Sequence, residues 1–154
     1  MIYHKLSTIT ETSLNEFLEF ASKQGPKTLF IDSDGGYIDY KDAIVYAINT
    51  STIQVVVVGS AHSAAFDLLL EVELTPIILN SAYSVVHISS HALESRGLRT
   101  PQDIAHFHKK TSAKHQQDQL DLYSKFMTPS EIKILEKGGN VYLDSQRLKQ
   151  IVNE

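Results

Sequence analysis

A serine and a histidine stand in this sequence where they could act together as a nucleophile and a base. Ser63 closes the segment that joins a valine-rich run to the helical pattern of 64–72. A serine at such a junction is held out by the turn, and the amides beside it point from the helix N-terminus. His87 ends a second apolar run. As a neutral imidazole it could take the proton of a serine hydroxyl.

A pair of glycines could supply the third part of an acyl-transfer site. The segment Ser33-Asp34-Gly35-Gly36 follows a predicted strand that ends near Asp32. Paired glycines allow a sharp turn with exposed amides, and exposed amides can hold an oxyanion. Each signal also has a plainer interpretation: the glycines form an ordinary turn, Ser63 or Ser60 caps a helix, and His87 is a structural histidine.

The elements that must position these residues alternate between strands and helices. Short apolar runs predict strands at 28–31, 53–58, 76–79 and 84–88. Helical spacing predicts helices at 39–50 and 64–72, and an earlier helix in which Ser13 and Glu16 are spaced like a capping box. This alternation is typical of an α/β sheet. A chain of 154 residues fits a single domain, 1–154.

The last third of the chain has a different character. Thr100 and Pro101 mark a helix start, and neither glycine nor proline follows before Phe126. The predicted helix, about 101–126, is polar on most faces, so it either projects from the body or awaits a partner. Beyond it the sequence predicts a short helix from Thr128-Pro129, a strand at 141–143 and a closing helix at 145–152.

Composition excludes several classes of function. The chain has no cysteine, which removes disulfides, thiolate metal sites and cysteine nucleophiles and suits a cytoplasmic location. A net charge of −4 offers no basic surface for nucleic acid. No apolar run is long enough to cross a membrane, and Met1–Thr10 lacks the pattern of a signal peptide. A metal site formed by His62, His87 and His91 is not expected. His87 and His91 are four residues apart but follow a strand, where that spacing does not converge as it does on a helix, and no clear third ligand is placed. No other cofactor is expected.

Taken in order, the three segments resemble the Clp peptidase proteolytic subunit family, within the crotonase-like superfamily. Ser33-Asp34-Gly35-Gly36 is similar to the family's Ser-Pro-Gly-Gly turn, with Asp34 in place of the proline. The segment 59–65 is similar to its Gly-x-Ala-x-Ser-x-x-Ala nucleophile segment, and 80–87 to the strand that carries its base. The resemblance implies an α/β fold with a stacked β-sheet core, outer helices and a projecting handle helix.

The resemblance also implies a serine-type endopeptidase. Ser63 would attack a peptide carbonyl, and His87 would take its proton and later give it to the leaving amine. The amides of Gly36 and Ala64 would form the oxyanion hole. A peptide or unfolded protein would run in extended form along Tyr37 and Ile38. A crotonase-type acyl-CoA enzyme also uses two amides, but it needs no nucleophilic serine.

The third member of the implied triad is open. The family carries an aspartate shortly before its last helix, and Asn140 falls at that position here. An asparagine can orient an imidazole, but it cannot stabilise the imidazolium with a charge. Asp144 or Asp121 could supply the acid instead. The alternative function is therefore a catalytically degenerate subunit of the same fold, with a structural or regulatory role.

The resemblance implies a ring-shaped homo-oligomer in which the handle helix pairs subunits. Ile104, Phe107, Leu120 and Tyr123 lie among the polar residues of that helix, and a second subunit could cover them. The family engages an unfoldase through its N-terminal segment. Here Met1–Thr10 is short before the first helix, so an unfoldase partner stays open.

Overall fold

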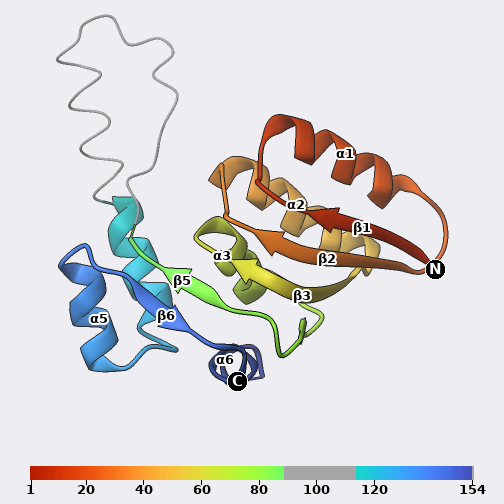
Figure 1. Ribbon diagram of the computed structural model, residues 1–154. Coiled ribbons are helices and arrows are strands. Elements are labelled where there is room, and N and C mark those ends of the chain that lie inside the picture. Colours follow the sequence, from red (N-terminus) through yellow and green to blue (C-terminus); the bar gives the residue numbers. More distant parts are fainter. Residues whose placement is uncertain (89–113, 154) are drawn as a thin grey trace, which may run out of the picture. The chain divides into compact units, whose positions relative to one another are not determined.

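A computed structural model describes residues 1–88 and 114–153 of the chain. The chain divides into two compact units, one formed by Met1–Val86 with Tyr142–Glu154 and the other by His87–Val141. The first unit contains a parallel sheet with helices packed against it (Figure 1). The predicted α/β class is therefore confirmed.

Four parallel strands form the main sheet, in the order β1-β2-β3-β4. Their bounds are β1 Ile2–Leu6, β2 Lys27–Ser33, β3 Gln54–Ala61 and β4 Ile77–Ile78. The register pairs Leu6 with Ile31, and Ile31 with Val57. Because neighbours in register point to the same face of a sheet, these side chains form one apolar row across it. The strand β1 is an addition to the predicted set.

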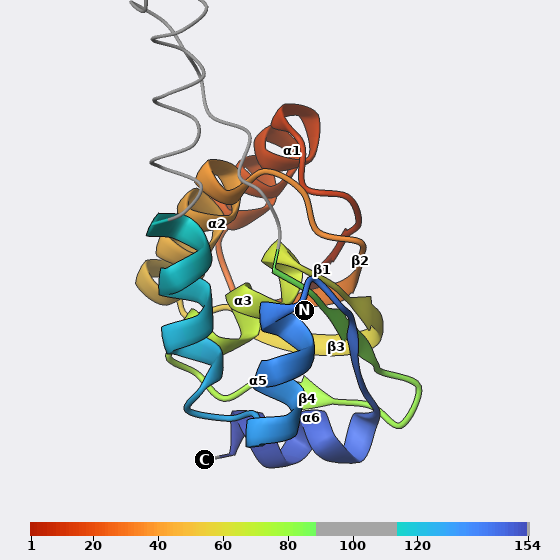
Figure 2. The ribbon, with the colours of Figure 1, turned by 90° about the vertical axis from the view of Figure 1, so that its left-hand side faces the viewer.

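The connecting helices of the sheet are α1 (Glu11–Ser22), α2 (Ile38–Ser51) and α3 (Ala64–Glu71). The two views show α1 and α2 lying side by side (Figures 1 and 2). The helices predicted at 39–50 and 64–72 are thus confirmed as α2 and α3, within one residue at each end. Strand β2 leads directly to the turn before α2, and β3 leads to the turn before α3.

The core lies between the sheet and these helices. Its largest members with no exposed surface include Phe17, Phe66, Leu29, Ile31 and Ile44. Burying a side chain of this size stabilises a fold by about 1.5–3 kcal/mol. The carboxyl ends of β2 and β3 are consequently fixed on a rigid platform, which is what a site at those ends needs.

An ion-pair cluster joins α2 to α3. The Lys41 side chain is 4% exposed, and its ammonium lies 2.6 Å from an oxygen of Asp42 and 2.7 Å from an oxygen of Glu71. Burial alone lowers the pKa of Lys41, but the hydrogen bonds to Asp42 and Glu71 raise it above its ordinary value. Removing the ammonium would therefore leave two carboxylates without their cation.

The helix α1 begins three residues before the predicted capping box. Its N-cap is Thr10, whose hydroxyl accepts a hydrogen bond from the Ser13 amide at 3.2 Å, while the Ser13 hydroxyl accepts one from the Thr10 amide at 2.8 Å. The prediction that Ser13 and Glu16 form the box was wrong. Serine at the third helical position can close the same reciprocal pair of bonds as a glutamate.

A small second sheet pairs β5 (Ser84–Val86) with β6 (Val141–Leu143). The helix α6 (Ser145–Val152) follows β6 at once, and Asp144 caps it by accepting a hydrogen bond from the Arg147 amide at 2.8 Å. The ring of Tyr142 stacks on Tyr83 with centroids 6.1 Å apart. The strand and helix predicted at 141–143 and 145–152 are confirmed.

The second unit contains a helix at 114–123 and the helix α5, Pro129–Glu136. The helix α5 starts at Pro129, as predicted, and Thr128 caps it in a capping box with Glu131. Of the predicted handle helix, residues 114–123 are helical. Residues 101–113, including Ile104 and Phe107, lie outside the described residues. Tyr123, for which a second subunit was expected as cover, is buried within the chain, with no exposed surface.

Within 1–88 and 114–153, no helix is both long and apolar enough to pass through a bilayer. The same residues hold no group of three or more histidine, cysteine or carboxylate side chains that could bind a metal ion. His91, one of the three histidines weighed above, lies outside them.

Candidate active site

Ser63 sits in a strained backbone conformation at the start of α3. Its φ is 53° and its ψ is −120°, a combination that residues with a β-carbon rarely adopt. Among described residues other than glycine, only Thr52 also has a positive φ. Strain of this kind costs on the order of 1–3 kcal/mol and is concentrated at functional sites. A sharp turn between a strand and a helix that exposes a serine is the geometry of a nucleophile elbow.

The interpretation of Ser63 as a helix cap is wrong. Ser63 occupies the N-cap position of α3, but its side chain makes no capping hydrogen bond. Ser60 does not cap the helix either, because its hydroxyl donates to an oxygen of Asp32 at 2.9 Å. The Ser63 hydroxyl therefore has no role in starting the helix.

Backbone hydrogen bonds hold the elbow, residues 62–64, in this conformation. The Ala65 amide donates to the His62 carbonyl at 3.0 Å, and the Asp67 amide donates to the Ser63 carbonyl at 3.1 Å. The His62 amide donates to the Ser33 carbonyl at 3.0 Å. The last bond ties the elbow to the end of β2, from which the glycine turn begins.

A carboxylate fixes the strand just before the elbow. Asp32 accepts hydrogen bonds from both the amide of Ser60, at 3.0 Å, and its hydroxyl. These two bonds, and to a smaller degree the ammonium of Lys5, hold the pKa of Asp32 below its ordinary value. A β-carbon on Gly59 would lie 2.5 Å from an oxygen of Asp32, so any larger residue there would displace this carboxylate. Sequence reasoning missed Asp32; the Gly59-Ser60 pair opposite the end of β2 was the available signal.

The glycine turn packs directly against the elbow. Gly35 has a φ of 97°, and a β-carbon placed on it would lie 2.7 Å from the His62 carbonyl oxygen and 3.0 Å from the β-carbon of Ser63. The Gly35 amide donates to the hydroxyl of the buried Ser33 at 3.1 Å. Position 35 therefore requires glycine for two reasons: its φ is positive, and the elbow packs against it too closely for a β-carbon.

Gly36 forms a parallel bridge with Ile9, the residue that follows β1 and precedes α1. The Ile9 amide donates to the Gly35 carbonyl at 2.7 Å, and the Tyr37 amide donates to the Ile9 carbonyl at 3.2 Å. A parallel bridge of this kind uses the groups on either side of the bridged residue. The amide of Gly36 itself therefore points away from Ile9.

The glycine turn contacts the first residue of α3. The Ala64 nitrogen lies 3.2 Å from the position that a β-carbon on Gly35 would take. Ala64 is the first residue of α3, and the first amides of a helix have no acceptor within it. The amides of Gly36 and Ala64 thus belong to touching segments on either side of Ser63.

Tyr37 and Ile38, the two residues expected to line the substrate, differ in backbone conformation. Tyr37 has an extended backbone, is 57% exposed, and its ring meets that of Tyr40 edge-on at 5.5 Å. Ile38 is already the first residue of α2. The extended edge beside the glycine turn therefore ends at Tyr37.

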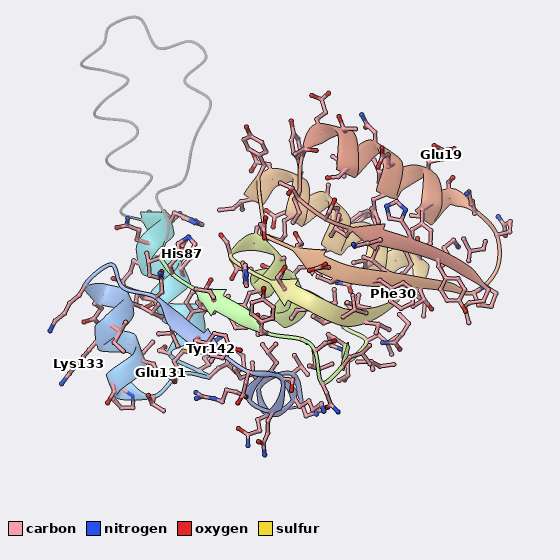
Figure 3. The ribbon with its side chains drawn as sticks, in the orientation of Figure 1. Glu19, Phe30, His87, Glu131, Lys133 and Tyr142 are labelled. Carbon is pink, nitrogen blue, oxygen red and sulfur yellow. The ribbon has the colours of Figure 1, made fainter. Side chains whose placement is uncertain are left out.

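His87 and Asn140 belong to the second unit, whereas Ser63, Gly36 and Ala64 belong to the first. His87 directly follows β5 and is partly exposed; its side chain is labelled in Figure 3. Asn140 directly precedes β6 and is exposed.

The two alternative acids both have partners on their own helices. Asp144 accepts the capping hydrogen bond from the Arg147 amide. Asp121 is exposed and accepts a hydrogen bond from the side-chain amide of Gln117 at 2.8 Å. Each carboxylate therefore has a local role that explains its presence.

Comparisons with known proteins gave a family match and a fold match. The family model described as Clp protease matches residues 5–144. Among solved structures, an asparagine-to-aspartate mutant of ClpP1 from Listeria monocytogenes is similar with a TM-score of 0.70 and 19% identity, over 99% of this chain and 88% of that one. At this identity the likeness concerns the fold. A search of curated proteins gave no match.

Proposed function

Since the chain belongs to the Clp protease family, we propose that it is a serine endopeptidase with Ser63 as nucleophile and His87 as base. The observation that carries the proposal is the strained conformation of Ser63, with its hydroxyl free of any capping role, against the glycine turn. A helix cap needs no such strain, whereas an exposed nucleophile does. The whole chain, 1–154, would form one peptidase domain.

The reaction proceeds in two acyl-transfer steps. The Ser63 oxygen attacks the peptide carbonyl while His87 takes the hydroxyl proton, and collapse of the tetrahedral intermediate releases the amine with that proton. Water then attacks the acyl-enzyme, with His87 again as base, and releases the carboxylate product and the free serine.

The amides of Gly36 and Ala64 stabilise the oxyanion that forms in each step. Donors that are fixed before the reaction cost no reorganisation, and removal of one such donor typically lowers kcat by roughly 100- to 1,000-fold. Support comes from the bridge with Ile9, which turns the Gly36 amide outward, and from the position of Ala64 as first residue of α3.

The proposed substrate is a peptide or unfolded protein in extended form. An extended chain can add its backbone hydrogen bonds to an open edge. The edge offered by Gly36 and Tyr37 is short, because α2 begins at Ile38. The exposed Tyr37 ring stands at the end of this edge, where it would contact a substrate side chain.

Asn140 orients the imidazole of His87 in this proposal. Its side-chain oxygen would accept a hydrogen bond from one ring nitrogen and leave the other free for the Ser63 proton. Without a carboxylate charge, the imidazolium is less stable, so activity is low. We expect Asn140→Asp to raise the rate of peptide-ester hydrolysis, measured together with the free energy of unfolding. An unchanged or lower rate in a normally folded variant would count against this role.

A degenerate subunit is the second candidate function, and Asn140 is the residue that favours it. The two candidates differ in what Ser63→Ala does to turnover of a short peptide ester. For an enzyme, turnover falls to background, whereas the matched variant Ser22→Ala, on the exposed face of α1, keeps it. Turnover that is absent from the unmodified chain, or unaffected by Ser63→Ala, would favour the degenerate subunit.

We propose further that the protein acts in the cytoplasm as a homo-oligomeric ring, with an unfoldase partner left open. Parallel sheets are normally covered on both faces. Here Tyr3, Ile77 and Leu79 are 61%, 49% and 41% exposed on strands or just beyond them, which supports cover by a second subunit. Sedimentation of a clean monomer at micromolar concentration would refute the assembly.

A further inference from the structure

The end of β3 and the segment that enters β5 run parallel as a short ladder. Ser60 and Tyr83 form a parallel bridge. The Tyr83 amide donates to the Gly59 carbonyl at 3.1 Å, and the Ala61 amide donates to the Tyr83 carbonyl at 3.0 Å. These bonds alternate between the two chains in the regular parallel pattern.

The next rung of this ladder uses a side chain. In a regular parallel pair the Val85 amide would donate to the Ala61 carbonyl. That carbonyl instead accepts from the Ser84 hydroxyl. The Val85 amide donates to Nδ1 of His62 at 2.9 Å. The imidazole thus replaces a backbone acceptor at the point where β3 turns away into the elbow.

This hydrogen bond fixes the tautomer of His62. A ring nitrogen that accepts an amide proton carries no proton of its own, so the imidazole is neutral and Nε2 bears the hydrogen. The ring also meets Tyr83 edge-on at 5.2 Å. His62 is therefore unsuited to act as the base for its neighbour Ser63, because Nδ1 is engaged and Nε2 is protonated.

We propose that His62 is a positioning residue for catalysis, which holds β5 against the nucleophile segment through Val85. This inference rests on the proposed function. Val85 is two positions before His87, and the intervening Val86 has no exposed surface. The same residue that precedes the nucleophile thereby fixes the strand that delivers the base, so that a shift of one element is passed to the other.

Asparagine and leucine at position 62 form a matched pair for testing this role. Both branch at the γ-carbon as histidine does. Asparagine places an acceptor oxygen where Nδ1 stands, whereas leucine places a methyl group there. His62→Asn should keep the bond to the Val85 amide, and His62→Leu should leave that amide without its acceptor.

The measurements are the rate at which a fluorophosphonate probe labels Ser63, kcat and KM for a peptide ester, and hydrogen exchange at the Val85 amide. A misplacement of about 1 Å can cost roughly 100-fold in rate. We expect His62→Leu to lower labelling and kcat by 10- to 100-fold with little change in KM, and to speed exchange at Val85. His62→Asn should stay within about 5-fold of the unmodified chain, since it retains an acceptor.

Two results would overturn the inference while the proposed function stands. One is labelling and kcat in a folded His62→Leu at the rates of the unmodified chain. The other is an equal loss in both variants, which would mean that the ring and not its acceptor matters. If the unmodified chain itself is not labelled at Ser63, the proposed function fails, and the positioning role fails with it.

Discussion

Replacing Gly35 with alanine tests whether the glycine turn and the Ser63 elbow form one packed unit. Gly35 has a φ of 97°, and the added β-carbon would lie 2.7 Å from the carbonyl oxygen of His62 and 3.0 Å from the β-carbon of Ser63. Gly25 provides a matched control, because its φ of 102° is similar and a β-carbon there meets nothing within 4 Å.

The difference between the two variants isolates the effect of the clash. A β-carbon at positive φ costs about 1–2 kcal/mol, and this cost is common to both sites. Overpacking adds about 1–3 kcal/mol at Gly35 alone. We therefore expect Gly25→Ala to lower the free energy of unfolding by about 1–2 kcal/mol and Gly35→Ala by about 2–5 kcal/mol.

Denaturant unfolding of both variants measures these losses, and probe labelling of Ser63 measures their effect on the site. The contacts of Gly35 are with the elbow itself, so relief of the clash must move His62 or Ser63. Labelling in Gly35→Ala should fall on the order of 100-fold, whereas Gly25→Ala should label normally. Equal stability losses with unchanged labelling in both variants would refute the packing of turn against elbow.

Three further predictions concern strain and charge. Ser63→Gly should be about 1 kcal/mol more stable than Ser63→Ala in denaturant unfolding, because glycine alone relieves the strained φ and ψ; the reverse order would mean that the elbow is unstrained. Lys41→Met should lower the free energy of unfolding by about 1 kcal/mol at pH 7. The loss is smaller than for a fully buried ion pair, because the carboxylates of Asp42 and Glu71 reach solvent. Since the folded pKa of Lys41 is raised, that stabilisation is complete below 10.5 and disappears as the pH rises through the folded value, so the two unfolding curves should converge in alkali; parallel curves would contradict it. Asp32→Asn should lower the free energy of unfolding by less than about 1 kcal/mol, because the Asp32 side chain is 43% exposed and solvent screens its interactions. The folded pKa of Asp32 is lowered, so its contribution to stability is present above pH 3.8 and is lost as the pH falls through the folded value. A difference in the free energy of unfolding between the unmodified chain and Asp32→Asn that persists in strong acid would show that the charge of Asp32 is not its cause.

The sequence predicted the sheet and the order of the site segments because these depend on local pattern. The valine run of β3 and the apolar run of β2 are typical of strands covered by helices. Strand β1 was missed because its five residues alternate between partly exposed and exposed positions, and only the last, Leu6, is buried. The start of α1 was misplaced because Thr10 and Ser13 form a capping box that the more usual glutamate spacing concealed.

The chemistry of the elbow was predicted only in outline. A serine after a glycine-containing segment indicates a turn, but its strained φ and ψ follow from the hydrogen bonds of His62 and Ser63 with neighbouring segments. The role of His62 depends on an amide 23 residues away along the chain. Such contacts between distant segments leave no periodic or spacing signal in one sequence.

Mapping the covalent adduct of a fluorophosphonate probe tests whether Ser63 is the nucleophile. The folded chain is treated with the probe, digested, and the modified peptide is identified by mass spectrometry. We expect one adduct, on Ser63, which is absent after denaturation before labelling and absent in Ser63→Ala. An adduct on another serine, or none on a folded chain that turns over peptide esters, would contradict it.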